Sequence, residues 1–185
     1  NDDLRARKLL DENIKMVEGR YQSRLLWRDD VVELPDSYSM AYNRLLGMER
    51  KMKRNLEFGA AYKQIIQEYL EKRYIRKIPS NECANVHPRT WFLPHFGVFN
   101  PNKPGKIRLV FDAAATVEGV SLNSKLLKGP KLYKPLPTVL FNFRVGAVAI
   151  CGDIREMFHQ ILVDPQDRCS QRFLWRDDVS QSPDV

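Results

Sequence analysis

Apolar residues in the first 75 positions recur every three or four residues, which is the spacing of one face of an α-helix. Residues 4–17 carry this pattern and can form one amphipathic helix. Asp36 or Ser37 can cap a second helix, and a third is expected to end near Tyr74. The apolar positions are Tyr38, Ala41, Leu45, Met48 and Met52 in one helix, and Phe58, Tyr62, Ile65, Ile66, Tyr69 and Leu70 in the other. The pattern therefore predicts a helical pair, preceded by a short strand over residues 23–29.

Short apolar runs separated by turn residues replace the helical pattern from residue 91 onward. Residues 91–99 and 106–111 flank the turn Asn100-Pro-Asn-Lys-Pro-Gly105, which predicts a β-hairpin. Pro94 indicates that its strand lies at a sheet edge or carries a bulge, because proline cannot donate a backbone hydrogen bond. Residues 79–90 are expected to form the loop that leads into this hairpin.

The remaining residues alternate between polar connectors and short apolar elements. A connector over residues 112–134 leads to a short helix that Pro135 introduces. The apolar run over residues 146–152 predicts a buried strand, and a final strand is expected over residues 170–176. The tail after it is expected to be frayed. Helices followed by small strands predict an α+β fold.

At 185 residues, with 43% hydrophobic and 29% charged residues, the chain has the composition of one globular domain. Its longest apolar run, residues 145–151, is far too short to cross a bilayer, so no membrane partner is expected. No signal peptide follows the charged N-terminus, which favours an intracellular location in the cytoplasm, the nucleus or both. The chain starts without Met, and we expect it to be a piece of something longer.

The formal net charge of +7 favours a polyanionic partner. Groups of basic residues alternate with aromatic residues, which suits a groove that binds the phosphates and bases of nucleic acid. The basic residues are Lys51, Lys53, Arg54, Lys72, Arg73, Arg76, Lys77, Lys103, Lys106 and Arg108, and the aromatic ones are Phe58, Tyr62, Tyr69, Tyr74, Trp91, Phe92 and Phe96. Most of these rings are expected to face the core, so the charge pattern alone does not identify the ligand.

The cysteines Cys83, Cys151 and Cys169 are odd in number and scattered, which favours reduced thiols over disulfides. Cys83 could be considered as a zinc ligand together with His87 and His95. These residues lack the paired spacing of structural zinc sites, so we do not predict a zinc site.

Asp153 follows the apolar run of residues 146–152. A carboxylate at the end of a buried strand can bind a metal ion, because the strand fixes its direction while its oxygens stay accessible. An Asp before a helix is also a preferred N-cap, and Glu156 three residues later is typical of a capping box. Pattern alone favours the cap. Two-metal catalysis needs several carboxylates, and the Asp pairs at 29–30 and 177–178 resemble exposed strand ends.

Eight short segments follow one another from Phe92 onward. They are Phe92-Leu-Pro-His, Gly97-Val-Phe-Asn-Pro, Lys106-Ile-Arg-Leu-Val-Phe-Asp-Ala, Gly119-Val-Ser-Leu-Asn, Leu126-Leu-Lys-Gly-Pro, Phe143-Arg, Gly152-Asp-Ile-Arg-Glu-Met-Phe-His-Gln-Ile and Asp167-Arg-Cys-Ser-Gln-Arg-Phe-Leu-Trp-Arg. In this order they resemble the reverse-transcriptase domain of BEL/Pao-type retrotransposon polyproteins. Residues 34–74 are similar to the lead-in of that domain.

The resemblance implies a role for five residues. Asp153 would be the first catalytic carboxylate and a Mg²⁺ ligand, and the main-chain carbonyl of Ile154 would bind metal as well. Phe158 would pack under the sugar of the incoming dNTP and exclude a ribose 2′-OH. Arg108 would bind the triphosphate, assisted by Lys106. From the residues alone, Phe158 could equally be a core residue, and Arg108 could pair with Asp112.

The implied fold is a partial right-hand polymerase fold of the α+β class. Residues 1–78 would form a helical lead-in region, and residues 79–185 the fingers hairpin and a truncated palm sheet of the reverse-transcriptase domain. Its partners would be an RNA or DNA template-primer, dNTP and the remainder of the polyprotein.

The chain also departs from the family. Asp112-Ala-Ala-Ala lacks the Ser that often follows this Asp in the family. The Tyr-x-Asp-Asp turn that supplies the other two carboxylates does not occur in the sequence, so we expect the isolated chain not to polymerise DNA. One alternative function is a non-catalytic nucleic-acid-binding remnant, and another is a helical interaction module that binds no nucleic acid.

Overall fold

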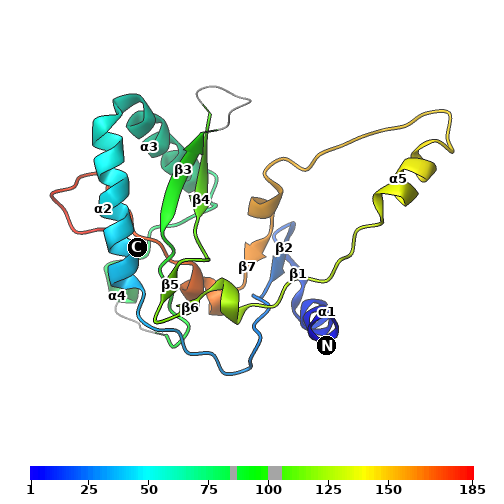
Figure 1. The fold of residues 1–185 in the computed structure, drawn as a ribbon, viewed down its shortest axis with the longest axis horizontal. Coiled ribbons are helices and arrows are strands. Elements are labelled where there is room, and N and C mark those ends of the chain that lie inside the picture. The colour runs from blue at the N-terminus through cyan, green and yellow to red at the C-terminus, as the bar shows by residue number, and fades with distance from the viewer. Residues whose placement is uncertain (84–86, 100–105) are drawn as a thin grey trace. The chain divides into compact units, whose positions relative to one another are not determined.

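A computed structural model describes residues 1–83, 87–99 and 106–185 of the chain. These residues form a mixed α+β structure of helices and three small sheets (Figure 1). The predicted turn over residues 100–105 lies outside the described residues. Within the described ranges, no helix is long and apolar enough to span a membrane.

The chain divides into two compact units, and each is built from segments that are distant in the sequence. The larger unit comprises residues 27–126 and 164–185. The smaller unit comprises residues 1–26 and 127–163. Each unit therefore contains residues from both predicted regions, 1–78 and 79–185.

Helices α2 (Tyr38–Arg54) and α3 (Leu56–Glu71) of the larger unit confirm the predicted helical pair. Asn55 separates them and caps the second, because its side-chain oxygen accepts a hydrogen bond of 2.9 Å from the backbone N–H of Phe58. The apolar faces of the two helices meet in the main core of the unit. The buried apolar residues are Ala41, Leu45, Met48, Met52, Phe58, Tyr62 and Ile66.

Strands β3 (His95–Phe99) and β4 (Ile107–Phe111) confirm the predicted hairpin and pair antiparallel in a two-stranded sheet. Ile107 and Leu109 are buried on the face that packs against α3. A Cβ atom at Gly97 would lie 2.9 Å from side-chain atoms of both Ile107 and Phe58. A glycine at this position therefore lets the sheet approach the helix closely.

Short elements complete the larger unit. They are α4 (Ser80–Cys83), β5 (Thr116–Val117), β6 (Val120–Ser121) and the 3-10 helices η1 (Asn123–Lys125) and η3 (Pro165–Gln171). Glu118 and Gly119 join β5 to β6 with φ values of 51° and 77°, so both residues of the turn are left-handed. The predicted loop over residues 79–90 and the predicted connector over residues 112–134 thus contain short helices and strands that the apolar pattern did not predict.

The C-terminal segment corrects two predictions. Residues 170 and 171 belong to η3, and the following residues join other segments through isolated bridges, Phe92 to Arg172 and Trp175 to Asp184, instead of a regular strand. The tail is not frayed, because the backbone N–H of Ile78 donates to the carbonyl of Val185 at 2.8 Å. Leu174 and Trp175 are buried in the same core as the helical pair, which holds the tail in place.

The smaller unit contains a three-stranded sheet and three helical segments. These elements are α1 (Asp2–Asn13), β1 (Lys15–Val17), β2 (Arg20–Ser23), α5 (Leu136–Phe143), η2 (Met157–Gln160) and β7 (Leu162–Val163). β2 pairs antiparallel with β1 and parallel with β7. α5 confirms the helix predicted after Pro135.

The sheet of the smaller unit corrects the two N-terminal predictions. The helix predicted over residues 4–17 ends at Asn13, because Ile14 is extended and the chain continues as β1. Glu18 and Gly19 then adopt left-handed φ angles and fold β1 back onto β2. The strand predicted over residues 23–29 lies earlier, since β2 ends at Ser23. Apolar periodicity did not locate this tight turn, which depends on Gly19.

The buried strand predicted over residues 146–152 is the largest error. This segment is irregular and exposed, with Val148 81% and Ile150 87% accessible to solvent. Among the described residues, no strand pairs with it. An apolar run becomes a buried strand only where a neighbour supplies backbone hydrogen bonds and a covering surface, and this segment lacks both.

Candidate functional site

Asp153 lies in the irregular segment between α5 and η2, where its side chain is exposed. The N-cap of η2 is Glu156, which has a left-handed φ of 51°. The prediction that Asp153 caps a helix is therefore wrong. Its carboxylate remains accessible to solvent and to a ligand.

Asp153 and Ile154 offer one carboxylate and one main-chain carbonyl as possible metal ligands. Both are the hard oxygen donors that Mg²⁺ prefers, so they fit this ion in kind. They do not fit it in number, because Mg²⁺ requires close to octahedral coordination and keeps several other oxygen ligands. Within the described ranges, no group of three His, Cys, Asp or Glu residues could hold a metal ion. A complete two-metal site would need further ligands.

Phe158 lies in η2 with 85% of its surface exposed. The alternative that it is a core residue is therefore wrong. Asp153, Ile154 and Phe158 are all exposed residues of the smaller unit, so each is accessible to a ligand.

Arg108 and Lys106 belong to the larger unit and lie on the hairpin. Arg108 is exposed on β4 opposite Val98, on the face directed away from the buried Ile107 and Leu109. The alternative that Arg108 pairs with Asp112 is not observed, because Asp112 forms an ion pair of 3.5 Å with Arg44. The two cations thus present their charge to solvent at the start of β4.

Aromatic rings and a third cation lie beside the hairpin. The Nζ atom of Lys51 is 4.4 Å from the ring centroid of Phe58, and the ring of Phe58 is 5.5 Å from that of Phe99. Phe99 is half exposed at the end of β3. Phe99 pairs with Ile107, so its ring and Lys51 lie on the face of the hairpin opposite to Arg108. An accessible ring near a cation is a feature of surfaces that bind nucleic acid.

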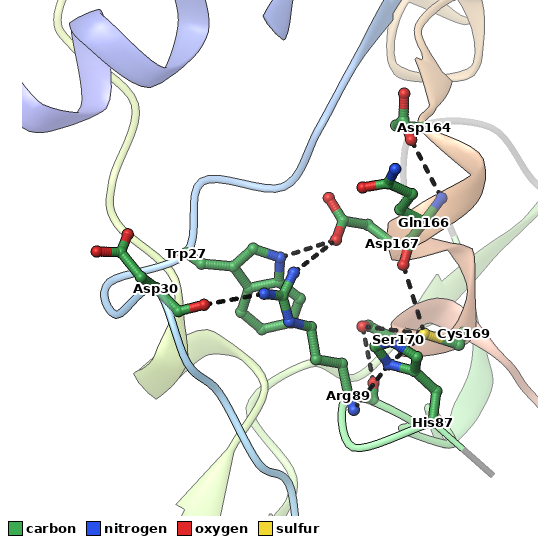
Figure 2. Close-up of polar contacts among 9 residues, drawn as sticks. All are labelled: Trp27, Asp30, His87, Arg89, Asp164, Gln166, Asp167, Cys169 and Ser170. Carbon is green, nitrogen blue, oxygen red and sulfur yellow. Dashed lines mark hydrogen bonds and ion pairs between the residues drawn. The ribbon is translucent and has the colours of Figure 1, made fainter.

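Figure 2 shows a second group of polar residues, centred on Asp167 of η3, whose contacts the sequence did not predict. Asp167 is fully buried and accepts a hydrogen bond of 3.0 Å from the indole N–H of Trp27. It also forms an ion pair of 3.2 Å with Arg89, whose other nitrogen donates to the carbonyl of Asp30 at 3.1 Å. One carboxylate therefore joins three segments of the larger unit. Such a network stabilises the fold, and its buried oxygen atoms are poorly placed to bind a ligand.

Cys169 and His87 lie at the edge of the Asp167 group (Figure 2). The Cys169 sulfur is 3.6 Å from Nδ1 of His87, and the same Nδ1 accepts a hydrogen bond of 3.1 Å from the backbone N–H of Arg89. Both Nδ1 and the thiol are therefore engaged in local contacts.

His95 lies in the core of the larger unit and does not join a zinc site with Cys83 and His87. Its Nε2 donates to the carbonyl of Leu174 at 2.8 Å, so Nδ1 accepts from the Tyr62 hydroxyl at 2.5 Å. Burial lowers the pKa of His95, against a smaller raising effect of the hydrogen bond to Leu174. Burial also raises the pKa of Tyr62. The pair is therefore neutral and serves as a packed polar contact.

No family model, curated protein or solved structure matches this chain.

Proposed function

We propose that this chain is part of a reverse transcriptase of the BEL/Pao retrotransposon type, and that it supplies the fingers hairpin and the first catalytic carboxylate. The observation that most supports the proposal is the β3–β4 hairpin, which carries exposed Arg108 and Lys106 and is backed by α2 and α3. The same residues carry one of the sequence segments on which the resemblance rests.

The chemistry of the hairpin suits a triphosphate. The guanidinium of Arg108 is planar and can donate two parallel hydrogen bonds to phosphate oxygens, and Lys106 adds a second positive charge. Rigid placement of these cations is favoured because Ile107 and Leu109, which alternate with them along the strand, are buried. Arg108 would orient the triphosphate, and Lys106 would increase the local attraction for it.

Asp153 and Ile154 would supply two of the oxygen ligands that Mg²⁺ needs, and the ion would supply charge neutralisation at the reacting phosphate when it is bound. The carboxylate of Asp153 would bind and orient this ion, while the ring of Phe158 would occupy the space that a ribose 2′-OH needs. The other two carboxylates of the family would come from outside these 185 residues, so the isolated chain is expected to lack polymerase activity.

Binding of a fluorescent dATP analogue, measured by anisotropy, tests the role of the hairpin. Arg108→Ala should weaken binding by about tenfold or more, because one charged phosphate contact contributes about 1.5–3 kcal/mol. Arg7→Ala is the matched control, since Arg7 is an exposed arginine of α1 in the other unit. Equal effects of the two substitutions would contradict a specific triphosphate contact at Arg108.

Primer extension with Mg²⁺ and dNTPs tests the incomplete metal site. The isolated chain should give no extended product, and Asp153→Ala should leave that result unchanged. DNA synthesis that disappears with Asp153→Ala would show that these residues suffice for catalysis and would overturn the proposal of a shared site.

A second candidate is a non-catalytic nucleic-acid-binding remnant, which the cations and the half-exposed ring of Phe99 beside the hairpin favour. It predicts that binding of an RNA–DNA template-primer weakens steeply with salt and is unchanged by Asp153→Ala. The polymerase proposal instead predicts that Mg²⁺ and the complementary dNTP tighten binding of the template-primer and that Arg108→Ala removes this gain. The two candidates therefore differ in the response to dNTP.

A further inference from the structure

We infer that residues 145–151 form a self-association surface through which two copies of this chain pair, strand against strand. The inference is independent of the proposed function, because it needs neither nucleic acid nor the residues Asp153, Arg108 and Lys106. It starts from the apolar run that sequence pattern predicts to be a buried strand and that is exposed in the structure.

The exposed apolar surface of the smaller unit extends beyond this run. Thirteen large apolar side chains between residues 132 and 158 are 44% to 87% exposed. They are Leu132, Tyr133, Leu136, Val139, Leu140, Phe141, Phe143, Val145, Val148, Ile150, Ile154, Met157 and Phe158. A monomeric protein rarely leaves so many large apolar side chains of one segment in contact with water.

The exposed apolar area of residues 132–158 is large enough for a stable dimer. Thirteen side chains with roughly 100–150 Å² exposed each amount to on the order of 1,500 Å². The largest apolar patch of a typical monomer is about 300–600 Å². A standard interface covers about 800 Å² on each partner, so half of this surface would suffice for a second copy.

The charge of the segment favours another copy of itself. Between Pro135 and Gly152 the chain carries a single charged side chain, Arg144, although the whole chain has a net charge of +7. Two copies approaching through this segment therefore meet little like-charge repulsion, whereas most other surfaces of so basic a protein would repel each other. A nucleic acid would gain little from a segment with one cation.

The backbone of residues 145–151 supplies the pairing. Val145, Val148 and Ile150 favour strands, the segment contains no Pro or charge, and no strand in the described part of the chain pairs with it. Two identical segments related by a two-fold axis can pair antiparallel, so that each satisfies the N–H and C=O groups of the other. The apolar side chains of both copies would then cover one another.

Sedimentation velocity of the full chain over a wide concentration range, in reducing buffer without nucleic acid, tests the inference. We expect a monomer at low concentration that converts to a dimer as concentration rises. The double substitution V148K/I150K should raise the dimer dissociation constant by about a hundredfold or more, because the pairing would bring lysines together in an apolar interface. The reducing buffer excludes a disulfide through the exposed Cys151 as the cause.

Val31→Lys is the matched control, because Val31 is an equally exposed valine in the larger unit. It should dimerise as the unmodified chain does, and so should Asp153→Ala. A chain that stays monomeric at all concentrations, or equal association of V148K/I150K and the unmodified chain, would overturn the inference. Assemblies that grow beyond a dimer would overturn the closed two-fold pairing. Far-UV circular dichroism checks that every variant is folded.

Discussion

Two apolar runs of this chain are each followed within two residues by an aspartate, yet they have opposite environments. Residues 107–111 precede Asp112 and form β4, which pairs with β3 and packs against α3. Residues 145–151 precede Gly152 and Asp153 and are exposed and irregular. Their compositions alone would predict a strand in both. The difference shows that an apolar run forms a buried strand only where other segments of its unit supply a pairing strand and a covering surface.

The supply of neighbours explains the contrast. β4 has its pairing strand, β3, close to it in the sequence, and α3 covers the face that carries Ile107 and Leu109. The run at 145–151 follows α5, whose own apolar side chains are exposed as well. A segment nearby in the sequence therefore pairs with β4, whereas residues 145–151 have no pairing strand within their unit.

The largest test of this contrast compares two phenylalanines. Phe58→Ala should reduce the free energy of unfolding by about 3–5 kcal/mol, because it opens a cavity in the core of the larger unit. Phe158→Ala should change it by less than about 0.5 kcal/mol, since that side chain is already exposed. Urea unfolding followed by circular dichroism measures both. Similar losses would mean that the exposed segment is packed in solution.

A second test compares a buried ion pair with an exposed one. Glu49 accepts two hydrogen bonds from Arg176, at 2.6 and 2.9 Å, and both side chains are buried. Glu49→Ala should cost about 3 kcal/mol, because it leaves the charge of Arg176 without its partner. Glu12→Ala removes an exposed pair with Lys8 and should cost at most about 0.5 kcal/mol.

The midpoint of urea unfolding, followed by tryptophan fluorescence, reads the Glu49 effect directly. Trp27, Trp91 and Trp175 all lie in the larger unit, so this signal reports on that unit. A small effect of Glu49→Ala would contradict the burial of the pair.

Two glycines sharpen the comparison of the two runs. Gly97→Ala should destabilise the larger unit by about 1–3 kcal/mol, because the added Cβ would lie 2.9 Å from Phe58 and Ile107 side-chain atoms. Gly152→Ala adds a Cβ that meets no atom within 4 Å and should be close to neutral. Thermal unfolding of the two variants measures the difference, and a neutral Gly97→Ala would refute close packing of the hairpin on α3.

The smallest expected effect is a pH dependence of the larger unit. The pKa of His95 is lowered by burial, so the unfolded chain binds a proton at a higher pH than the folded chain does. The contribution of His95 to stability is therefore complete above about pH 6.5 and is lost as pH falls through its lowered pKa. The urea concentration at the midpoint of unfolding should therefore be lower at pH 5 than at pH 7.5 for the unmodified chain.

His95→Gln should flatten this pH dependence, whereas His87→Gln should preserve it, because His87 is exposed. Identical pH profiles for the unmodified chain and His95→Gln would show that another group controls the response.

Elements whose stabilising contacts are close together in the chain could be predicted from the sequence. The three- and four-residue spacing of Ala41, Leu45 and Met48 located α2, and the turn residues at 100–105 indicated the hairpin strands on either side. The strand predicted over residues 146–152 was wrong, because nothing in the local sequence shows whether another segment can pair with it.

The candidate site divides in the same way. Arg108 and Asp153, which we propose as contacts of a triphosphate and a metal, were named from sequence segments, and both are exposed. The burial of Asp167 could not be predicted, because its partners Trp27 and Arg89 are 140 and 78 residues away. Periodicity carries no information about contacts at that separation.

The division of the larger unit into two separated segments has a consequence for synthesis on the ribosome. Helices α2 and α3 and the hairpin are translated early, but the core that they share also requires Leu174 and Trp175. The core of the larger unit therefore stays incomplete and partly exposed to water while residues 132–158, whose apolar side chains are also exposed, are translated. We expect this interval to be the time at which a chaperone is most needed.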